Sequence, residues 1–258
     1  TGGVTAGAIT GGSTGSVGWV GWVGSSGTLV GAATVGRRYQ PFSLPGGDVA
    51  VRNPVRVALA LLHECGIDDV DGLPCVEEIP AAERAAVESQ LVSGVGCIRT
   101  TSAGRLFDGV ASLLGVRHRV TYEAQAAIEL EALARTAPHP APLTMQVEND
   151  QLTLPLLVSG LVAGLRDGTP PAALALGFHH ALAAATADLV DRAATATGAS
   201  TIGLTGGVFQ NRLFLALVRA HWESSGYRVL THHRVPPNDG GLSLGQAVIG
   251  AAATMRGP

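Results

Sequence analysis

The sequence predicts an α/β fold, because short apolar segments alternate with amphipathic ones over residues 201–258. Residues 201–204 and 228–231 are predicted strands, and the helical patterns of residues 211–224 and 244–253 follow them. Strands that alternate with helices in this way imply a mostly parallel sheet. In such sheets ligands bind at the loops beyond the carboxyl ends of the strands, so we expect a site in these loops.

The composition excludes several classes of protein. The chain has 258 residues, 14% of them charged, and a mean hydropathy of +0.29, yet no stretch approaches the roughly 18 uninterrupted apolar residues of a membrane helix. The net charge is −3 and no basic run is visible, so the footprint of a general nucleic-acid binder is missing. No secretory signal is visible at the N-terminus. We therefore expect a cytoplasmic protein with no nucleic-acid and no membrane partner.

Two residue types limit the chemistry. All 17 basic residues are arginines, which excludes any reaction that needs a lysine amine. Cys65, Cys75 and Cys97 are odd in number and lack CxxC spacing, which argues against a disulfide framework or a zinc knuckle. We expect them to be small buried hydrophobic residues.

The N-terminal segment differs from the rest of the chain. Residues 1–47 contain no Asp or Glu and only two Arg, with a glycine every few residues. The run of residues 17–24 repeats with a period of three, which suits neither a helix nor a strand. We expect residues 1–40 to be an atypical glycine-rich leader, either poorly ordered or degenerate through translation out of frame. A glycine phosphate loop is a third interpretation, but no strand and helix flank it.

Two further segments follow the leader. Residues 41–140 are predicted to be largely helical, and prolines at positions 138–142 mark the candidate boundary with an α/β segment over residues 141–258. Within the first of these segments, helical patterns cover residues 55–62, 81–92 and 122–135, another helix ends near Gly115, and residues 66–80 are loop-like. Within the second, residues 152–157 are strand-like, and an alanine-rich helix over residues 172–197 is closed by Gly198.

The first candidate binding loop follows the strand at residues 201–204. Gly206 and Gly207 let the backbone approach a ligand closely, and the next helix offers unpaired N–H groups to a phosphate. Asn211 lies in the first helical turn and can hydrogen-bond a nucleotide. The alternative is a tight turn in which Asn211 only caps the helix.

The second candidate loop contains Asp239, which lies among glycines after a strand and before a helix. A carboxylate in this position is typical of a metal or magnesium–phosphate ligand, although an aspartate also caps helices well. The pairs His179–His180 and His232–His233 lack the i, i+4 spacing of a helical metal site, and we interpret both as structural.

Four residues upstream are further candidates. Gly104 permits close approach at the start of a helix, and Arg105 can contact phosphate in a bidentate way. Asp108 and Glu123 can accept ribose hydroxyl groups. The alternative for both carboxylates is that they complement a helix dipole.

Taken together, these motifs resemble the C-terminal part of the HypF family over about residues 41–255. The matching stretches, in the same order and with similar spacing, are residues 44–48, Gly104–Gly115 (GRLFDGVASLLG), residues 120–131 (VTYEAQAAIELE), residues 206–213 (GGVFQNRL), residues 234–242 (RVPPNDGGL) and residues 245–247 (GQA). HypF proteins are the carbamoyltransferases of nickel–iron hydrogenase maturation.

The resemblance implies a Kae1-like domain of the actin/Hsp70-type ATPase fold, with two α/β lobes around a nucleotide cleft. In this family a YrdC-like domain makes carbamoyl-adenylate from carbamoyl phosphate and ATP. The Kae1-like domain then passes the carbamoyl group to the C-terminal cysteine of the partner HypE. Asp239 matches the family's metal-ligand aspartate, and the metal would be iron, zinc or magnesium. The nucleotide-binding loop is matched by Gly206, Gly207 and Asn211, and positions facing the cleft by Gly104, Arg105, Asp108 and Glu123.

The sequence also departs from the family pattern. The family holds its metal with an additional histidine cluster upstream of an Asp-Gly-Thr-Gly motif, and neither motif is present. Residues 1–40 stand where that motif's strand pair is expected, and the YrdC-like domain is absent, so we expect a truncated piece with an incomplete first lobe. Besides a carbamoyltransferase fragment, an inactive module that binds nucleotide or HypE, a decayed gene product without a stable fold, and a sugar or acetate kinase of the same superfamily remain open.

Overall fold

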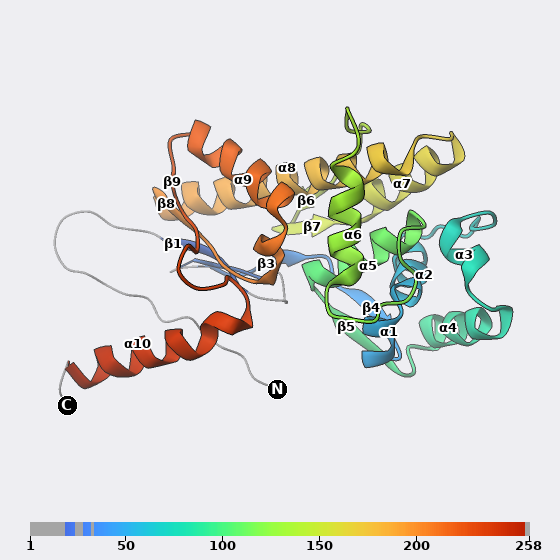
Figure 1. Ribbon diagram of the computed structural model, residues 1–258, viewed down its shortest axis with the longest axis horizontal. Coiled ribbons are helices and arrows are strands. Elements are labelled where there is room, and N and C mark those ends of the chain that lie inside the picture. Colours follow the sequence, from blue (N-terminus) through green and yellow to red (C-terminus); the bar gives the residue numbers. More distant parts are fainter. Residues whose placement is uncertain (1–18, 24–27, 32–33, 256–258) are drawn as a thin grey trace.

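In the computed structural model the chain is described over residues 19–23, 28–31 and 34–255. This part of the chain is built around a seven-stranded sheet with the strand order β6-β7-β3-β2-β1-β8-β9 (Figure 1). The strands are β1 (Trp19–Val23), β2 (Thr28–Gly31), β3 (Thr34–Tyr39), β6 (Gln146–Glu148), β7 (Gln151–Thr153), β8 (Thr201–Leu204) and β9 (Arg228–Leu230).

The sheet is mixed, so the expectation of a mostly parallel sheet is wrong. The pairs β1–β8, β8–β9 and β3–β7 are parallel, whereas β1–β2, β2–β3 and β6–β7 are antiparallel. The last pair is a tight hairpin, in which Asn149 and Asp150 both have positive φ angles of 48° and 59°. Asn and Asp tolerate this conformation, which two-residue hairpin turns require. The alternation of strands and helices therefore predicted only the half of the sheet around β8 and β9.

The interpretation of residues 17–24 as neither helix nor strand is wrong for Trp19–Val23, which is β1. This strand pairs in parallel with β8, from Trp19 opposite Thr201 to Trp22 opposite Leu204, and antiparallel with β2. A ladder uses backbone groups, so a strand with partners on both sides can form without an alternating side-chain pattern. An antiparallel strand pair thus lies where the sequence indicated none. The rest of the predicted leader falls partly on residues 1–18, outside the described residues.

Helices make up most of the remaining described chain. They are α1 (Asp48–Arg52), α2 (Pro54–Glu64), α3 (Pro74–Glu78), α4 (Ala81–Ser93), α5 (Ala103–Leu113), α6 (Gln125–Ala134), α7 (Pro155–Arg166), α8 (Pro171–Thr197), α9 (Arg212–Ser224) and α10 (Leu242–Met255). A small second sheet pairs β4 (Phe42–Pro45) with β5 (Cys97–Thr100). The short helix α3 lies in the segment that was expected to be loop, where Pro74 occupies its first turn.

One hydrophobic core runs through the sheet and the helical part. In Figure 1, α8 lies along the sheet, while α2 and α5 lie to its side with β4 and β5. The core includes Leu61 of α2, Leu106 of α5, Phe178 of α8 and Phe214 of α9, all of which are completely buried. The division of the chain at residues 140 and 141 stays a prediction, but the sheet runs across it, because β3 pairs with β7 and β1 with β8.

Helix α8 is the central support of the site described below. It is 27 residues long and apolar enough to cross a membrane by length and composition, the one helix of the described residues that passes this test. Most of its apolar window is buried against α6, α9 and the sheet, as in a core helix. Gly198, in the left-handed conformation with φ 69°, ends it as the sequence predicted.

Candidate functional site

The two glycine loops lie side by side at the carboxyl ends of β8 and β9. The first holds the short 3₁₀ helix η1 (Gly207–Gln210), and the second holds η2 (Asp239–Gly241). The backbone N–H of Gly206 donates to the carbonyl of Pro237 at 2.7 Å. Because β8 and β9 are parallel neighbours, their carboxyl ends meet at the same edge of the sheet. The expectation that both loops follow strand ends at this edge is confirmed.

The two glycines of the first loop differ in how strictly glycine is needed. Gly206 has φ 112° and ψ 156°, a region open essentially to glycine alone. A Cβ on Gly207 would meet only the Cβ of Asn238, at an ordinary 3.8 Å. The backbone geometry therefore requires glycine at position 206, and it leaves position 207 tolerant.

Asn211 caps α9, which is the alternative that the sequence left open. Its Oδ1 accepts a hydrogen bond from the backbone N–H of Phe214 at 2.8 Å. Its Nδ2 lies 3.0 Å from Nε2 of His179 in α8. The side chain is therefore engaged by the protein on both sides, and one hydrogen of its amide remains for a ligand.

The hydrogen-bond donors that face a ligand differ from those the sequence suggested. In α9 the N–H of Leu213 donates to Oε1 of Glu131 at 3.1 Å, and the N–H of Phe214 is taken by the cap. Within the described residues, the N–H groups of Gly207 and Val208 at the start of η1 form no hydrogen bond. The N–H of Arg212 at the start of α9 likewise forms no hydrogen bond with another described residue, so the loop and the first residue of α9 together offer free donors to an anion.

A hollow of about 480 Å³ opens beside the two loops, between α9 and the chain that follows β9. Its polar lining is cationic or neutral and includes no carboxylate, and the other lining residues are apolar. The lining residues are Leu204, Phe209, Gln210, Arg212, Leu215, Arg219, Thr231, His232, His233 and Pro237. Arg219 is paired with Glu223 at 2.7 Å, whereas Arg212 is exposed and forms no ion pair with another described residue. Apolar residues beside arginines suit a ligand with a flat ring and a phosphate.

Asp239 alone does not fit a divalent metal. It is exposed in η2, and no group of three His, Cys, Asp or Glu side chains able to hold a metal lies within the described part of the chain. Nearby, Nε2 of His232 is engaged by Oγ1 of Thr205 at 2.9 Å. One carboxylate falls short of the ligand number that Mg²⁺, Zn²⁺ or iron requires. No chemical step is therefore assigned to a metal on these residues.

Helix α5, which carries three of the predicted residues, packs against the first loop, and these residues differ in their exposure to solvent. Helix α5 packs against η1, and Ser102 caps it by accepting from the N–H of Arg105. Gly104 and Arg105 are partly exposed, whereas Asp108 is 3% exposed and lies 3.0 Å from Nη1 of Arg105. Burial raises the pKa of Asp108 to about 6, although the charge of Arg105 opposes the shift. Asp108 thus pairs with Arg105 from a buried position and is not exposed to receive a ribose.

Glu123 is not brought to the loops by any described contact. It lies exposed in the turn before α6, and it forms no hydrogen bond or ion pair with another described residue. The helix begins at Gln125, later than the predicted residue 122, because Ala124 adopts the left-handed conformation with φ 60°. Glu123 is therefore outside the first turn of α6, and the helix-dipole alternative does not describe it.

Sequence reasoning missed three contributors to this site. Pro237 supplies the carbonyl that joins the loops, Arg212 supplies an unpaired charge, and His179 supports Asn211. Arg212 directly follows the GGVFQN motif and was within reach of the sequence. The carbonyl of Pro237 and the ring of His179 carry no such signal, because only the fold brings them to the loop.

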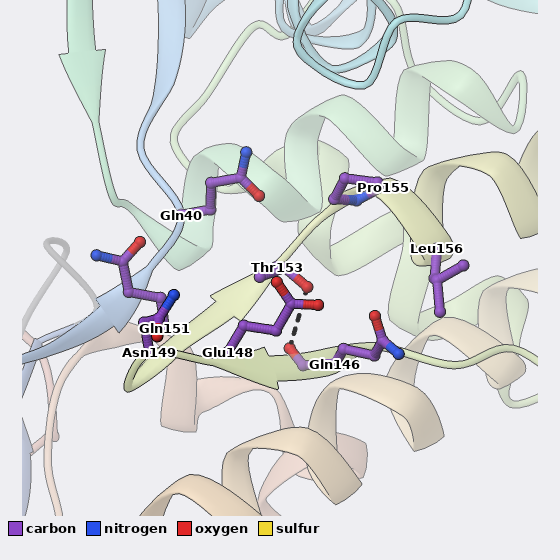
Figure 2. A pocket seen from close by; sticks show the side chains of 8 residues that line it. All are labelled: Gln40, Gln146, Glu148, Asn149, Gln151, Thr153, Pro155 and Leu156. Carbon is purple, nitrogen blue, oxygen red and sulfur yellow. Dashed lines mark hydrogen bonds between the residues drawn. The ribbon is translucent and has the colours of Figure 1, made fainter.

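A second hollow lies at the opposite edge of the sheet. Its volume is about 600 Å³, and Figure 2 shows its lining by Gln40, Gln146, Glu148, Asn149, Gln151, Thr153, Pro155 and Leu156. Thr153 donates to the carbonyl of Gln146, and the side-chain oxygen of Gln40 accepts from the N–H of Leu154. The lining has no cation and one carboxylate, and β6 and β9 are the two outermost strands of the sheet order. This hollow suits an anionic ligand poorly and is separate from the glycine loops.

A sequence model described as "Carbamoyltransferase, Kae1-like Domain, second subdomain" matches residues 32–246, most of the chain. The chain belongs to the HypF carbamoyltransferase family. It is 39% identical over 216 residues to carbamoyltransferase HypF of Rhodobacter capsulatus, covering 83% of this chain and 27% of that protein. It is 39% identical over 222 residues to a HypF homologue of Cupriavidus necator, covering 82% of this chain and 56% of that protein.

The fold agrees with solved HypF structures. The crystal structure of full-length HypF in the phosphate- and nucleotide-bound form superposes with a TM-score of 0.77 at 28% identity, covering 91% of this chain and 32% of that one. The predicted α/β, Kae1-like fold of the actin/Hsp70 type is thereby confirmed. The chain spans less than two thirds of each of these HypF proteins, so it corresponds to one part of them.

Proposed function

We propose that the chain is the nucleotide-binding part of an ATP-dependent carbamoyltransferase of hydrogenase maturation. In this proposal carbamoyl phosphate and ATP give carbamoyl-adenylate, and the carbamoyl group passes to the C-terminal cysteine of a HypE-type acceptor. The observation that carries the proposal is the pair of joined glycine loops, with free N–H groups at Gly207 and Val208 beside a cationic hollow.

The residues of this chain would bind and orient the carbamoyl-adenylate, and the acceptor protein would supply the nucleophile. The chain contains no lysine, and burial raises the pKa of both Cys65 and Cys75 to about 12. Neither thiol is therefore a thiolate near neutral pH. The acceptor's thiolate would attack the carbamoyl carbon, the bond to the adenylate phosphate would break, and AMP would leave. Arg212 and the loop N–H groups would hold the phosphate that carries the departing charge, a role that the unpaired Arg212 and the free N–H groups support.

The proposal also covers the metal, the YrdC-like domain and the location of the protein in the cell. Asp239 would supply at most one ligand to iron, zinc or magnesium, and the other ligands and the YrdC-like domain would be supplied by another chain. Gly104 and Arg105 would face the nucleotide from α5, whereas the exposed Glu123 has no described contact with the loops. We further propose a cytoplasmic protein that binds neither nucleic acid nor membranes.

The test is binding followed by transfer. Isothermal titration of the chain with ATP and with AMP, with and without Mg²⁺, measures whether the site forms. The chain is then mixed with a YrdC-like domain, carbamoyl phosphate, ATP and HypE, and the mass of HypE is measured. We expect HypE to gain one carbamoyl group, and a HypE variant without its C-terminal cysteine to gain none. Nucleotide binding that is absent under all conditions would overturn the proposal.

A second function is favoured by the lone Asp239. Since no metal-binding cluster lies within the described residues, a catalytically inactive homologue that binds nucleotide or HypE is the alternative. The same two measurements separate them. ATP binding without any mass change in HypE would favour the binding module, and binding with transfer would favour the enzyme.

A further inference from the structure

His179 lies completely buried in α8, directly behind the first glycine loop. Its ring meets the edge of Phe107 from α5 at a centroid distance of 5.4 Å and that of Phe178 at 5.5 Å. Nδ1 is 2.7 Å from the carbonyl of Ala175, and Nε2 is 3.0 Å from Nδ2 of Asn211. Both ring nitrogens therefore have a protein partner, in a pocket closed by aromatic side chains.

These contacts determine where the proton of the neutral ring resides. A carbonyl oxygen only accepts hydrogen bonds, so Nδ1 must carry the proton and donate it to Ala175. Nε2 is then a bare acceptor, and Asn211 must turn its NH₂ group toward it. The Oδ1 of Asn211 is thereby left for the N–H of Phe214, which is the observed cap of α9. One histidine tautomer thus fixes the amide orientation of Asn211.

We propose that His179 is a positioning residue of the nucleotide loop: its neutral ring holds Asn211, and through Asn211 it holds the conformation of residues 206–211. This rests on the proposed nucleotide function of the loop. The backbone supports the coupling, since the N–H of Asn211 donates to the carbonyl of Val208 and the N–H of Phe209 to that of Gly206. Releasing Asn211 from α8 would loosen the turn that presents the free N–H groups.

The surroundings keep the ring neutral. Burial lowers the pKa of His179, although the Ala175 carbonyl and Glu131 of α6 oppose this. His180 of α8 and Arg135 of α6 add to the lowering. The elements packed around the ring also carry the Arg105–Asp108 ion pair of α5, Glu129 of α6, the Arg192–Asp188 pair and Asp191 of α8, and Arg212 and the Arg219–Glu223 pair of α9. A second proton would place an N–H at Nε2 against the NH₂ of Asn211. The loop should therefore lose its support in acid.

A matched pair of substitutions tests the proposal. His179→Gln keeps an acceptor near the position of Nε2, and His179→Met has a similar shape without a strong one. His180→Met, one residue along on the exposed side of α8, is the control. Hydrogen exchange of the Phe209 and Asn211 amides is measured by NMR, in the absence of nucleotide. We expect exchange to accelerate at least tenfold in His179→Met relative to His179→Gln, with amides of α2 unchanged in both variants.

Nucleotide binding gives the second readout. If the wild-type chain binds ATP, we expect the Kd to rise about tenfold in His179→Met, with most of that loss restored in His179→Gln and no change in His180→Met. The wild-type Kd should also rise with falling pH, and this dependence should be reduced in His179→Gln. Unaltered loop exchange in His179→Met would overturn the proposal whether or not ATP binds. Absence of ATP binding together with accelerated exchange would overturn the nucleotide function alone.

Discussion

The N–H of Gly206 donates to the carbonyl of Pro237 across 2.7 Å, and this hydrogen bond joins two loops that are 31 residues apart in the chain. Oγ1 of Thr205 lies 3.5 Å from the same carbonyl. The positive φ of Gly206 turns its N–H toward the second loop, and the parallel pairing of β8 with β9 brings the two loops to one edge. Backbone geometry therefore assembles the candidate site before any side chain contributes.

Gly206→Ala should damage this arrangement, and Gly207→Ala should not. An alanine at φ 112° and ψ 156° is strained by roughly 1–3 kcal/mol. If the backbone relaxed to relieve this strain, the N–H of residue 206 would turn away from Pro237. We expect a lower Tm and at least a tenfold weaker ATP affinity in Gly206→Ala, measured by calorimetry. Gly207→Ala meets only an ordinary contact with Asn238 and is the matched control for Tm. Equal Tm values for the two variants would show that the turn accommodates a side chain at position 206.

Gly177→Ala should destabilise the chain through a backbone clash. A Cβ there would lie 2.4 Å from the carbonyl oxygen of Ala141, which approaches α8 just after the proline-rich segment. Because the neighbour is backbone rather than a flexible side chain, we expect a loss of about 1–3 kcal/mol in the free energy of unfolding, measured with urea. Gly245→Ala in α10 has no atom within 4 Å and should be neutral or slightly stabilising.

Asp108 should make the chain less stable as the pH rises from about 4 to 7. Burial raises its pKa from 3.8 to about 6, so between these values the folded state holds a proton that the unfolded state has lost. The stability contributed by this carboxyl is present below pH 3.8 and is lost as the pH rises through 6, by roughly 3 kcal/mol. Subtraction of the pH–stability curve of Asp108→Asn, which cannot titrate, isolates the effect. A difference curve that is flat over this range would contradict it.

Phe107→Ala should weaken the contact between the helical part and the site. Its ring meets those of Phe178, His179 and Phe214 at centroid distances of 5.0, 5.4 and 6.4 Å, so it joins α5, α8 and α9. We expect a loss of roughly 3–5 kcal/mol in the free energy of unfolding by urea denaturation. Tyr122→Ala, at a side chain that is 53% exposed, should change it by less than about 0.5 kcal/mol.

The sequence predicted the helices well where a periodic apolar face met a clear end signal. Helix α8 was expected over residues 172–197 and is Pro171–Thr197, because Pro171 suits a first turn and Gly198 suits the left-handed residue that ends it. The strands of the glycine-rich segment were not predicted. Trp19–Val23 is a strand through its ladder to β8, a partner about 180 residues later, and no local pattern encodes such a pairing.

Some features of the candidate site could likewise be predicted from the sequence, and others could not. The motif around Gly206, Gly207 and Asn211 was visible in the sequence, and the adjacent loop of Asp239 followed from the alternation of strands and helices. The sequence could not tell that Asp108 is buried beneath Arg105. Nor could it tell that Glu123 lies outside its helix, since this depends on the backbone turn at Ala124.

By itself the sequence determined the family, the helical segments and the two glycine loops, because these depend on local residue types at fixed spacing. Only the tertiary structure decided which groups are free to bind a ligand. In α9 the N–H groups of Leu213 and Phe214 are occupied by Glu131 and Asn211, so the donors left free among the described residues are those of Gly207, Val208 and Arg212. His179 became part of the site because α8 packs behind the loop and leaves its Nε2 no partner but Asn211. Such choices depend on burial and on competition for hydrogen bonds, which exist only once distant segments have packed together.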